Sequence, residues 1–486
     1  MSISQALSTA GSGLGATSKR ASVVAGNVSN ALTPGYVRRE VSTVERIVGG
    51  QGAGVDISGV TRSQNAALTA SRRASEADSV KDQEIATAEA QLSRALGGPD
   101  DEYAFFKSIS NLENAFSALR ETPESATLQR NVLEAAKELT SDFHQLSTEA
   151  NNLRLRADEK IERQVKEVND ALQSIDSLNA EIRSGQASGR DVTALEDQRQ
   201  RLIDRVSGII PIREVPSGDG EVNLITQEGV FLLSGRPIEL SFDRATTIGP
   251  ESTLLNGDVS GLRVGDVDIT PGSNAQLALR GGSLAAQFAI RDRIAPEFSS
   301  QLDALAEDLI RRFSDPAVDP SLSGGAPGLF TDGGAAIAVV PPAGVASRIA
   351  VNAAVDPDSG GALSRFRDGV GATSEGPAGS ATIVDSLLAG LRERRPITGA
   401  GFSGLVSAVD AGADFSSLRA TASLSAERIA TTSAARTKGL IEAEQEISAV
   451  DTDFELQNLL QIEQAYQANA RVIQIVDQML SRLLEI

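Results

Sequence analysis

The sequence lacks cysteine and tryptophan altogether, and its 486 residues include only 3 tyrosines and a single histidine. Without cysteine the chain can form neither disulfide bonds nor thiolate metal sites, and a cysteine nucleophile is excluded. Aromatic residues make up 3% of the chain, so buried surface must come mainly from Leu, Ile, Val and Ala. This composition favours packed helices over aromatic-lined pockets.

Positive charge is scarce as well. The chain has 45 Lys and Arg residues and 65 Asp and Glu residues, which gives a formal net charge of -20. Nucleic acid is therefore not expected as a partner, because a phosphate backbone repels a surplus of carboxylates. The chain also has no apolar run of about 18 residues and no charged-then-apolar leader. We expect no membrane insertion, and any export must use an uncleaved signal.

Side chains suited to catalysis or metal binding are scattered. We expect His144 to be an ordinary residue on the surface of a long helix, because the partners of a catalytic triad or a zinc site are missing. Asp356 begins a segment like a calcium loop, but Gly360 and Arg367 stand where that loop needs carboxylates. We therefore expect no catalytic, cofactor-binding or metal-binding residue. Three N-terminal glycines lack the spacing of a phosphate-binding loop and should instead keep the first helix thin: Gly11, Gly13 and Gly15.

The N-terminal segment carries a regular apolar pattern. Its apolar and small residues alternate steps of four and three, which is typical of the seam of a coiled coil. The seam residues are Ile3, Leu7, Ala10, Leu14, Thr17, Ala21, Val24 and Val28. This pattern predicts a helix that requires a partner helix.

The C-terminal segment repeats this pattern. Its seam runs through Leu459, Ile462, Tyr466, Asn469, Ile473, Val476, Leu480 and Leu483. Further apolar residues, such as Val472, Ile475 and Met479, flank the seam, so one partner helix would not cover this helix. We therefore expect the two ends to pair with each other and then with other copies of the chain.

The rest of the chain predicts a multidomain protein of helices plus strands. Helices are expected at 76–96, 102–119, 126–184, 192–206, 283–313, 383–394 and from 415 to the end, and short strands at 221–226, 230–233 and 238–242. The expected parts are a terminal coiled coil (1–44 with 447–486), a domain rich in long helices (45–210 with 281–314 and 402–446), a β-rich insert (211–280) and a loosely specified insert of both types (315–401).

Two terminal segments closely resemble a known group of proteins. Residues 27–39, NVSNALTPGYVRR, resemble the N-terminal motif of flagellar rod, hook and hook-associated proteins, and residues 450–486 are similar to the C-terminal helix of the same axial family. The matching motif residues are Asn27, Asn30, Pro34, Gly35 and Tyr36. Interior segments 178–209 and 281–294 resemble the hook-associated members, whereas hook and rod proteins lack these helices.

This resemblance implies a structural protein of the bacterial flagellum. It would be secreted unfolded through the flagellar type III export apparatus, and it would join the hook to the filament as a ring of subunits required for filament assembly. The implied partners are copies of itself, hook protein, a second junction protein on the filament side and a cytoplasmic export chaperone. The expected assembly or chaperone contacts are Ile3, Leu7, Leu14, Val24, Val28, Leu459, Ile462, Tyr466, Ile473, Val476, Leu480 and Leu483.

Two alternatives remain open at this point. A hook or distal rod protein would share both terminal motifs but would lack the long helix before the β-rich insert. An exported enzyme built on an axial scaffold would need a clustered catalytic site between Pro211 and Gly401, and the sequence shows no such motif there.

Overall fold

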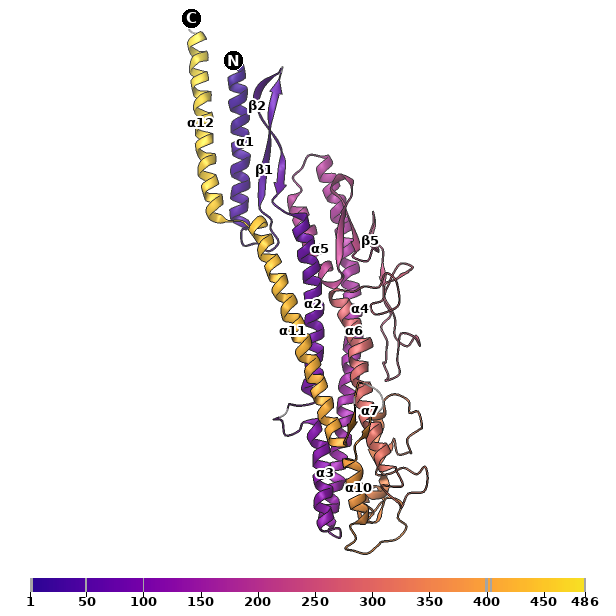
Figure 1. The fold of residues 1–486 in the computed structure, drawn as a ribbon. Coiled ribbons are helices and arrows are strands. Elements are labelled where there is room, and N and C mark those ends of the chain that lie inside the picture. Colours follow the sequence, from indigo (N-terminus) through magenta and orange to yellow (C-terminus); the bar gives the residue numbers. More distant parts are fainter. Residues whose placement is uncertain (1–2, 49, 99, 398–400, 403, 485–486) are drawn as a thin grey trace. The chain divides into compact units, whose positions relative to one another are not determined.

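The computed structural model describes residues 3–48, 50–98, 100–397, 401–402 and 404–484 (Figure 1). The chain forms two compact units. The terminal unit consists of Met1–Ser79, Lys166–Leu240 and Ser433–Ile486, and the middle unit consists of Val80–Val165 and Ser241–Thr432. Three of the four boundaries fall inside helices, namely α2 (Ala66–Ala95), α4 (Ala126–Ala187) and α11 (Ala408–Ser448). The division into four parts expected from the sequence stays a prediction.

The terminal unit is organised around its N-terminal helix. In chain order it contains α1 (Ile3–Asn30), β1 (Arg39–Val48), β2 (Gln51–Arg62), the first part of α2, the last part of α4, α5 (Thr193–Ile209), β3 (Ile212–Pro216), β4 (Val222–Thr226), β5 (Phe231–Leu233), the last part of α11 and α12 (Thr452–Leu484). Helix α1 lies between α12 on one side and the β1–β2 hairpin on the other (Figure 1).

The hairpin is antiparallel and irregular. Arg39 pairs with Arg62 at its open end, Val48 pairs with Gln51 near the turn, and two register shifts interrupt β1. Polar side chains of α1 fix the hairpin in place. Ser12 Oγ accepts a hydrogen bond from the Val55 backbone N–H at 3.1 Å. This hairpin was not predicted from the sequence.

A small antiparallel sheet, β3-β4-β5, follows α5. Leu224 of its central strand is fully buried. Asn179 of α4 holds the first residue of this strand by donating to the Val222 carbonyl at 2.9 Å. The predicted strands over 221–226 and 230–233 are confirmed, whereas β3 was not predicted.

The middle unit is a bundle of helices with short β-rich connections. It contains the remaining parts of α2, α4 and α11 together with α3 (Phe105–Glu121), α6 (Gly282–Ala289), α7 (Ala295–Phe313), α8 (Val345–Arg348), α9 (Arg365–Asp368), α10 (Thr382–Arg392) and strands β7 (Arg263–Val264), β8 (Val267–Asp268), β9 (Phe330–Asp332), β10 (Ile349–Val351), β11 (Arg395–Pro396) and β12 (Leu405–Val406); β6 (Leu240–Ser241) crosses the unit boundary. A turn of π-helix, Ile290–Ile294, joins α6 to α7.

Most of the phenylalanines lie in the core of the middle unit. The rings of Phe105 and Phe143 meet edge to face at 5.0 Å, and Phe298 lies 5.2 Å from Phe415. Aliphatic side chains of α3, α4, α7 and α10 surround these rings. Helical packing therefore dominates as predicted, and phenylalanine is concentrated at the places where several helices meet.

The long helices were predicted well, and their ends less well. The expected helix 126–184 corresponds to α4, and the expected helix 383–394 corresponds to α10. Helix α2 begins at Ala66, ten residues before the predicted start, and the expected helix from 415 to the end is two helices separated at residues 449–451. Among the residues that the structure describes, no helix is both long and apolar enough to span a bilayer.

Candidate assembly surface

The predicted seam of α1 is only partly buried. Ala10, Thr17 and Val24 are buried, and Ile3 and Leu14 are half-buried. Two other seam residues, Leu7 and Val28, are exposed. Helix α1 therefore keeps exposed seam positions although it has a neighbour on each side.

Helices α1 and α12 approach closely at a glycine. A Cβ atom added to Gly13 would lie 2.9 Å from the side-chain amide of Asn469, whereas one added to Gly11 or Gly15 would meet nothing within 4 Å. The expectation that glycine keeps this helix thin therefore has a contact to explain it at Gly13 only.

Helix α12 is covered on one side only. Val476 is buried, and Ile462 and Ile473 are half-buried. The other expected contact residues Leu459, Tyr466 and Leu480 are exposed, and the side chain of Leu483 lies outside the described residues.

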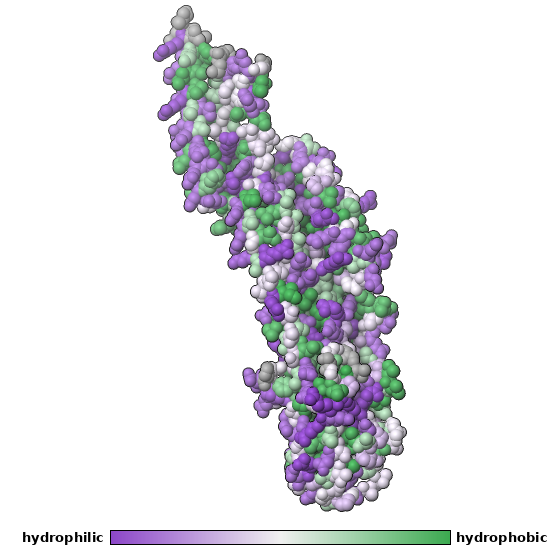
Figure 2. Space-filling view, viewed as in Figure 1, coloured by the Kyte–Doolittle hydropathy of each residue, from purple (hydrophilic) through white to green (hydrophobic). Residues whose placement is uncertain are grey.

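Exposed apolar residues lie on two flanks of α12. Leu459, Tyr466 and Leu480 follow a seven-residue spacing along one flank. Val472, Ile475 and Met479 occupy another, with Ile475 51% and Met479 52% exposed. Further exposed apolar residues lie on the hairpin: Val44, Ile47, Val48 and Ile57. Figure 2 shows apolar side chains interrupting the polar surface over this part of the molecule. Exposed apolar side chains that gather in this way are typical of a surface that contacts another molecule.

The N-terminal motif forms the turn between α1 and the hairpin. Asn27 is fully buried; its Nδ2 donates to the Arg39 carbonyl, and its Oδ1 accepts from the Arg39 N–H and the Tyr36 hydroxyl, with all three distances between 2.9 and 3.0 Å. Burial raises the pKa of Tyr36. Gly35 has a φ of 75°, which favours glycine, and a Cβ there would meet Arg201. Asn30 donates to the Gly26 carbonyl, and Pro34 is exposed in the turn.

A buried carboxylate ties the hairpin to α5. Asp197 lies 2.7 Å from Arg39 Nη2 and 2.8 Å from Arg62 Nε, and its side chain is almost completely buried. The Arg39 guanidinium also stacks over the Tyr36 ring at 4.8 Å. The motif is therefore stabilised by a contact with α5 as well as by contacts between its own residues.

A second ion pair connects the start of the hairpin to α12. Arg38 Nε lies 3.0 Å from Glu455 Oε1, and the guanidinium stacks over the Phe454 ring at 5.0 Å. The Arg38 backbone N–H donates to the Ser448 carbonyl at 2.9 Å. Sequence reasoning missed both Arg38 and Glu455, although each lies inside a segment that carries the resemblance.

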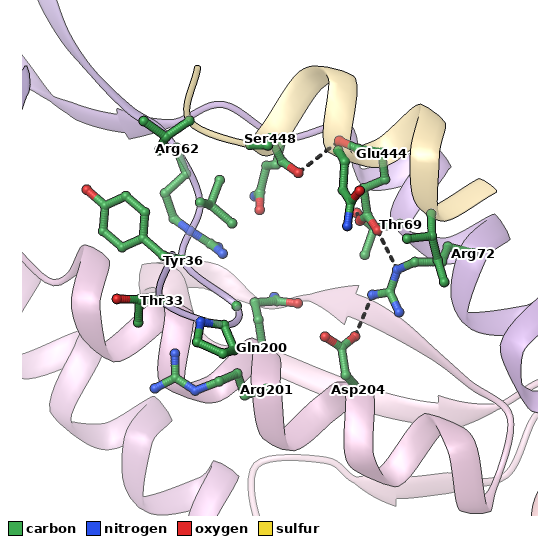
Figure 3. Close-up of a pocket in the computed structure, with 18 of the residues that line it drawn as sticks. Thr33, Tyr36, Arg62, Thr69, Arg72, Gln200, Arg201, Asp204, Glu444 and Ser448 are labelled. Carbon is green, nitrogen blue, oxygen red and sulfur yellow. Dashed lines mark hydrogen bonds and ion pairs between the residues drawn. The ribbon is translucent and has the colours of Figure 1, made fainter. Parts of the chain in front are cut away.

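A groove of about 460 Å³ lies beside the motif (Figure 3). Thr33 and Tyr36 lie on one side of it, and Arg72 of α2 lies on the other, pairing with Asp204 of α5 at 2.7 Å and with Glu444 of α11. Burial alone would raise the pKa of Asp204, but Arg73 and Arg72 outweigh burial and hold the pKa below its ordinary value. The ion pairs beside this groove join α2 to α5 and α11, which indicates a structural role.

The residues considered as chemical candidates have structural roles. His144 is exposed on α4, and its Nε2 lies 2.7 Å from the Ile349 carbonyl oxygen. Asp356 pairs with Lys137 at 3.0 Å and accepts from the Asp358 N–H. Within the described ranges there is no group of three or more His, Asp or Glu residues placed to hold a metal ion.

The chain is similar to several known flagellar proteins. A family model described as the helical domain of flagellar hook-associated protein FlgK matches residues 90–316, and a model for the C-terminal part of flagellar basal body rod FlgEFG proteins matches residues 444–486. The chain is 25% identical over 516 residues to flagellar hook-associated protein 1 of Bacillus subtilis (strain 168), covering 98% of this chain and 97% of that relative. The solved structure of the flagellar hook junction protein FlgK from Burkholderia pseudomallei is similar over 55% of this chain and 47% of that one, with 19% identity and a TM-score of 0.44.

The paired terminal helices and the matching C-terminal model define the class as an axial protein of the bacterial flagellum. Within that class, the chain is similar to flagellar hook-associated protein 1, FlgK, in its helical domain over residues 90–316 and, at 25% identity, over 98% of its length. Members of this family are structural rather than enzymatic components of the extracellular flagellum, located at the hook-filament junction, and they have flagellar assembly partners.

Proposed function

We propose that the chain joins the hook to the filament as a ring of subunits, in which α1 and α12 form the inner wall and filament assembly depends on the ring. The observation that carries the proposal is the one-sided covering of α12. Apolar side chains remain exposed on both flanks of its α1-facing side. A helix with this surface gains stability when neighbouring helices cover it.

Ring formation requires two different surfaces on each subunit. In a head-to-tail interface one patch meets a different patch on the next copy, and the contact repeats until the ring closes. The two apolar flanks of α12 supply two such surfaces: Leu459, Tyr466 and Leu480 on one, and Val472, Ile475 and Met479 on the other. Hook protein below and a second junction protein above complete the proposed set of assembly partners.

The same helix needs protection before assembly. We propose that a cytoplasmic export chaperone covers α12 until the chain passes unfolded through the type III export apparatus. The support is the exposed apolar surface, which promotes aggregation when it is left uncovered. The chaperone and the neighbouring subunits would therefore use α12 at different times.

The first test is genetic. Deleting the gene in the source bacterium should leave hooks that end bare while unpolymerised flagellin leaks into the medium. The parent gene should restore filaments. Normal motile filaments in the deletion strain would refute the proposal, and loss of the hooks would refute the junction role.

The second test uses paired variants of α12. Ile475→Asp with Met479→Asp places two charges on exposed apolar positions, whereas Gln474→Asp with Gln478→Asp places the same charges on exposed polar positions. We expect the first pair to reduce the number of filaments at least about tenfold, because burying two unpaired carboxylates costs several kcal/mol. The control pair should complement fully, and equal complementation by both pairs would contradict the assignment of this flank.

The fate of the variant chain separates the two uses of α12. Monomeric variant in the medium would show that export succeeded and that assembly failed, which supports the contact between subunits. Variant retained in the cytoplasm, together with weaker binding to the chaperone, would instead assign this flank to the export step.

A further inference from the structure

A second cavity of the terminal unit has an unusual charge. It measures about 390 Å³ and lies between β2, the start of α2, α5 and β3. Its charged lining residues are Arg62, Arg73, Arg199, Arg213, Glu196 and Glu214. Four arginines thus face two glutamates in a chain whose net charge is -20. We call this cavity the arginine pocket.

Two of the four arginines are neutralised within the chain. Arg62 Nε lies 2.8 Å from Asp197, and Arg73 pairs with Asp204 at 2.6 Å and with Glu214. These pairs use one of the two lining glutamates. The charges that remain are the positive charges of Arg199 and Arg213 and the negative charge of Glu196.

Arg199 is buried without a carboxylate partner. It is 5% exposed, and its Nη1 donates to Asn179 Oδ1 at 2.8 Å and to the Gly220 carbonyl at 2.7 Å. Its Nε is buried and has no acceptor among the described residues, none of which places a carboxylate within 4.0 Å of this guanidinium. Burial lowers the pKa of Arg199, and Glu196, one turn earlier in α5, opposes that effect without forming an ion pair.

A guanidinium in this position keeps its proton, because arginine does not deprotonate in proteins. A buried charge without a counter-charge is costly, and a bound anion removes that cost. Arg213 lines the same pocket, is exposed, and makes no ion pair within the part of the chain that the structure describes. Two donors of this type match the oxygen atoms of a phosphate or carboxylate group.

We propose that the arginine pocket binds a small oxyanion between Arg199 and Arg213. The oxyanion is either free phosphate or a carboxylate of a second copy of the chain in the ring, and the second source rests on the function proposed above. Both sources present the same negatively charged oxygen atoms.

The first experiment measures thermal unfolding of the full chain with sodium phosphate against sodium chloride at constant ionic strength. We expect a saturable rise in Tm of about 2–4 °C at ten times Kd, because the anion binds the folded state only. Arg213→Gln should weaken phosphate binding about tenfold and leave the fold intact, since its side chain is exposed. Arg199→Met should abolish the response.

The control is Arg205→Gln, which removes an exposed charge from the same helix outside the pocket. It should respond to phosphate as the parent chain does. An equal rise in chloride, or an unchanged response in Arg213→Gln, would overturn the proposal. Neither result would affect the proposed ring, which the bare-hook test examines independently.

A second experiment separates the two sources. Bare hooks from the deletion strain are incubated with purified chain in phosphate-free buffer. The fraction of capped hooks, meaning hooks that carry the chain at their end, is then counted. If Arg213→Gln lowers this fraction while Arg205→Gln does not, the ligand is a carboxylate of a neighbouring subunit. If both cap hooks like the parent chain and only Arg213→Gln loses phosphate binding, the ligand is free phosphate.

Discussion

The buried carboxylate of Asp197 offers a direct test of what holds the N-terminal motif in place. Asp197→Asn keeps the shape of the side chain and removes its charge. Arg39 and Arg62 then lose their shared carboxylate, and Arg62 is nearly as well buried as Asp197 itself. We expect the hairpin to detach locally from α5 more often than it does in the parent chain.

The size of the effect follows from the two contacts. Arg39 Nη2 donates a hydrogen bond to the carboxylate, and a bond of this type to a charged group contributes about 1.5–3 kcal/mol, whereas Arg62 adds an ion pair. Asparagine keeps one acceptor oxygen, which recovers part of the loss. The net loss should therefore be about 2–4 kcal/mol, which overlaps the range of about 3–5 kcal/mol for breaking a buried ion pair. That loss corresponds to amide exchange about 30 to 700 times faster in the hairpin.

Hydrogen exchange read by mass spectrometry measures this loss segment by segment. Exchange should accelerate in β1 and β2, whereas α3 and α7 of the middle unit provide an internal reference. Glu181→Gln, which removes an exposed charge from α4, is the matched control and should leave the hairpin unchanged. Hairpin exchange within about threefold of the parent value in Asp197→Asn would refute the reasoning.

Two further predictions concern α1 and α5. Gly15→Ala should slow exchange in α1 about two- to fivefold, because alanine favours a helix by about 0.5–1 kcal/mol, whereas Gly13→Ala should lose this gain against Asn469; equal slowing in both variants would count against the close approach. Asp204 has a folded pKa below its unfolded value, so its contribution to stability is present above about pH 4 and disappears as the pH falls through the folded pKa. In denaturant titrations, Asp204→Asn should therefore be less stable than the parent chain at pH 7, and the gap should close towards pH 3; a constant gap would contradict the ion pairs with Arg72 and Arg73.

The long helices could be predicted because the local spacing of apolar residues indicates them. Residues 126–187 contain one glycine near the end and no proline, so the apolar spacing alone indicates α4. The heptad pattern at each end likewise predicted the pairing of α1 with α12. The break between α11 and α12 was missed, although Asp451 accepts hydrogen bonds from the N–H groups of Asp453 and Phe454 as an N-terminal cap.

The hairpin could not be predicted in the same way. Most residues of β1 are exposed, so the strand lacks the alternation of apolar and polar positions that indicates a half-buried strand. Its stability depends on α1, through Ser12, and on α5, through Asp197. Such contacts join residues far apart in the chain, and no local pattern reports them. The contact between Arg38 and Glu455 could not be predicted for the same reason.

The bond from the Arg38 N–H to the Ser448 carbonyl, and the one from Ser63 Oγ to the Ile447 carbonyl, join the beginning of the chain to its end. During synthesis, residues 1–79 therefore leave the ribosome long before residues 433–486 exist to complete their unit. Contacts of such large separation form slowly because the loop between them must close first. The terminal unit should thus mature last, which leaves a period in which the unfinished chain can be held and delivered.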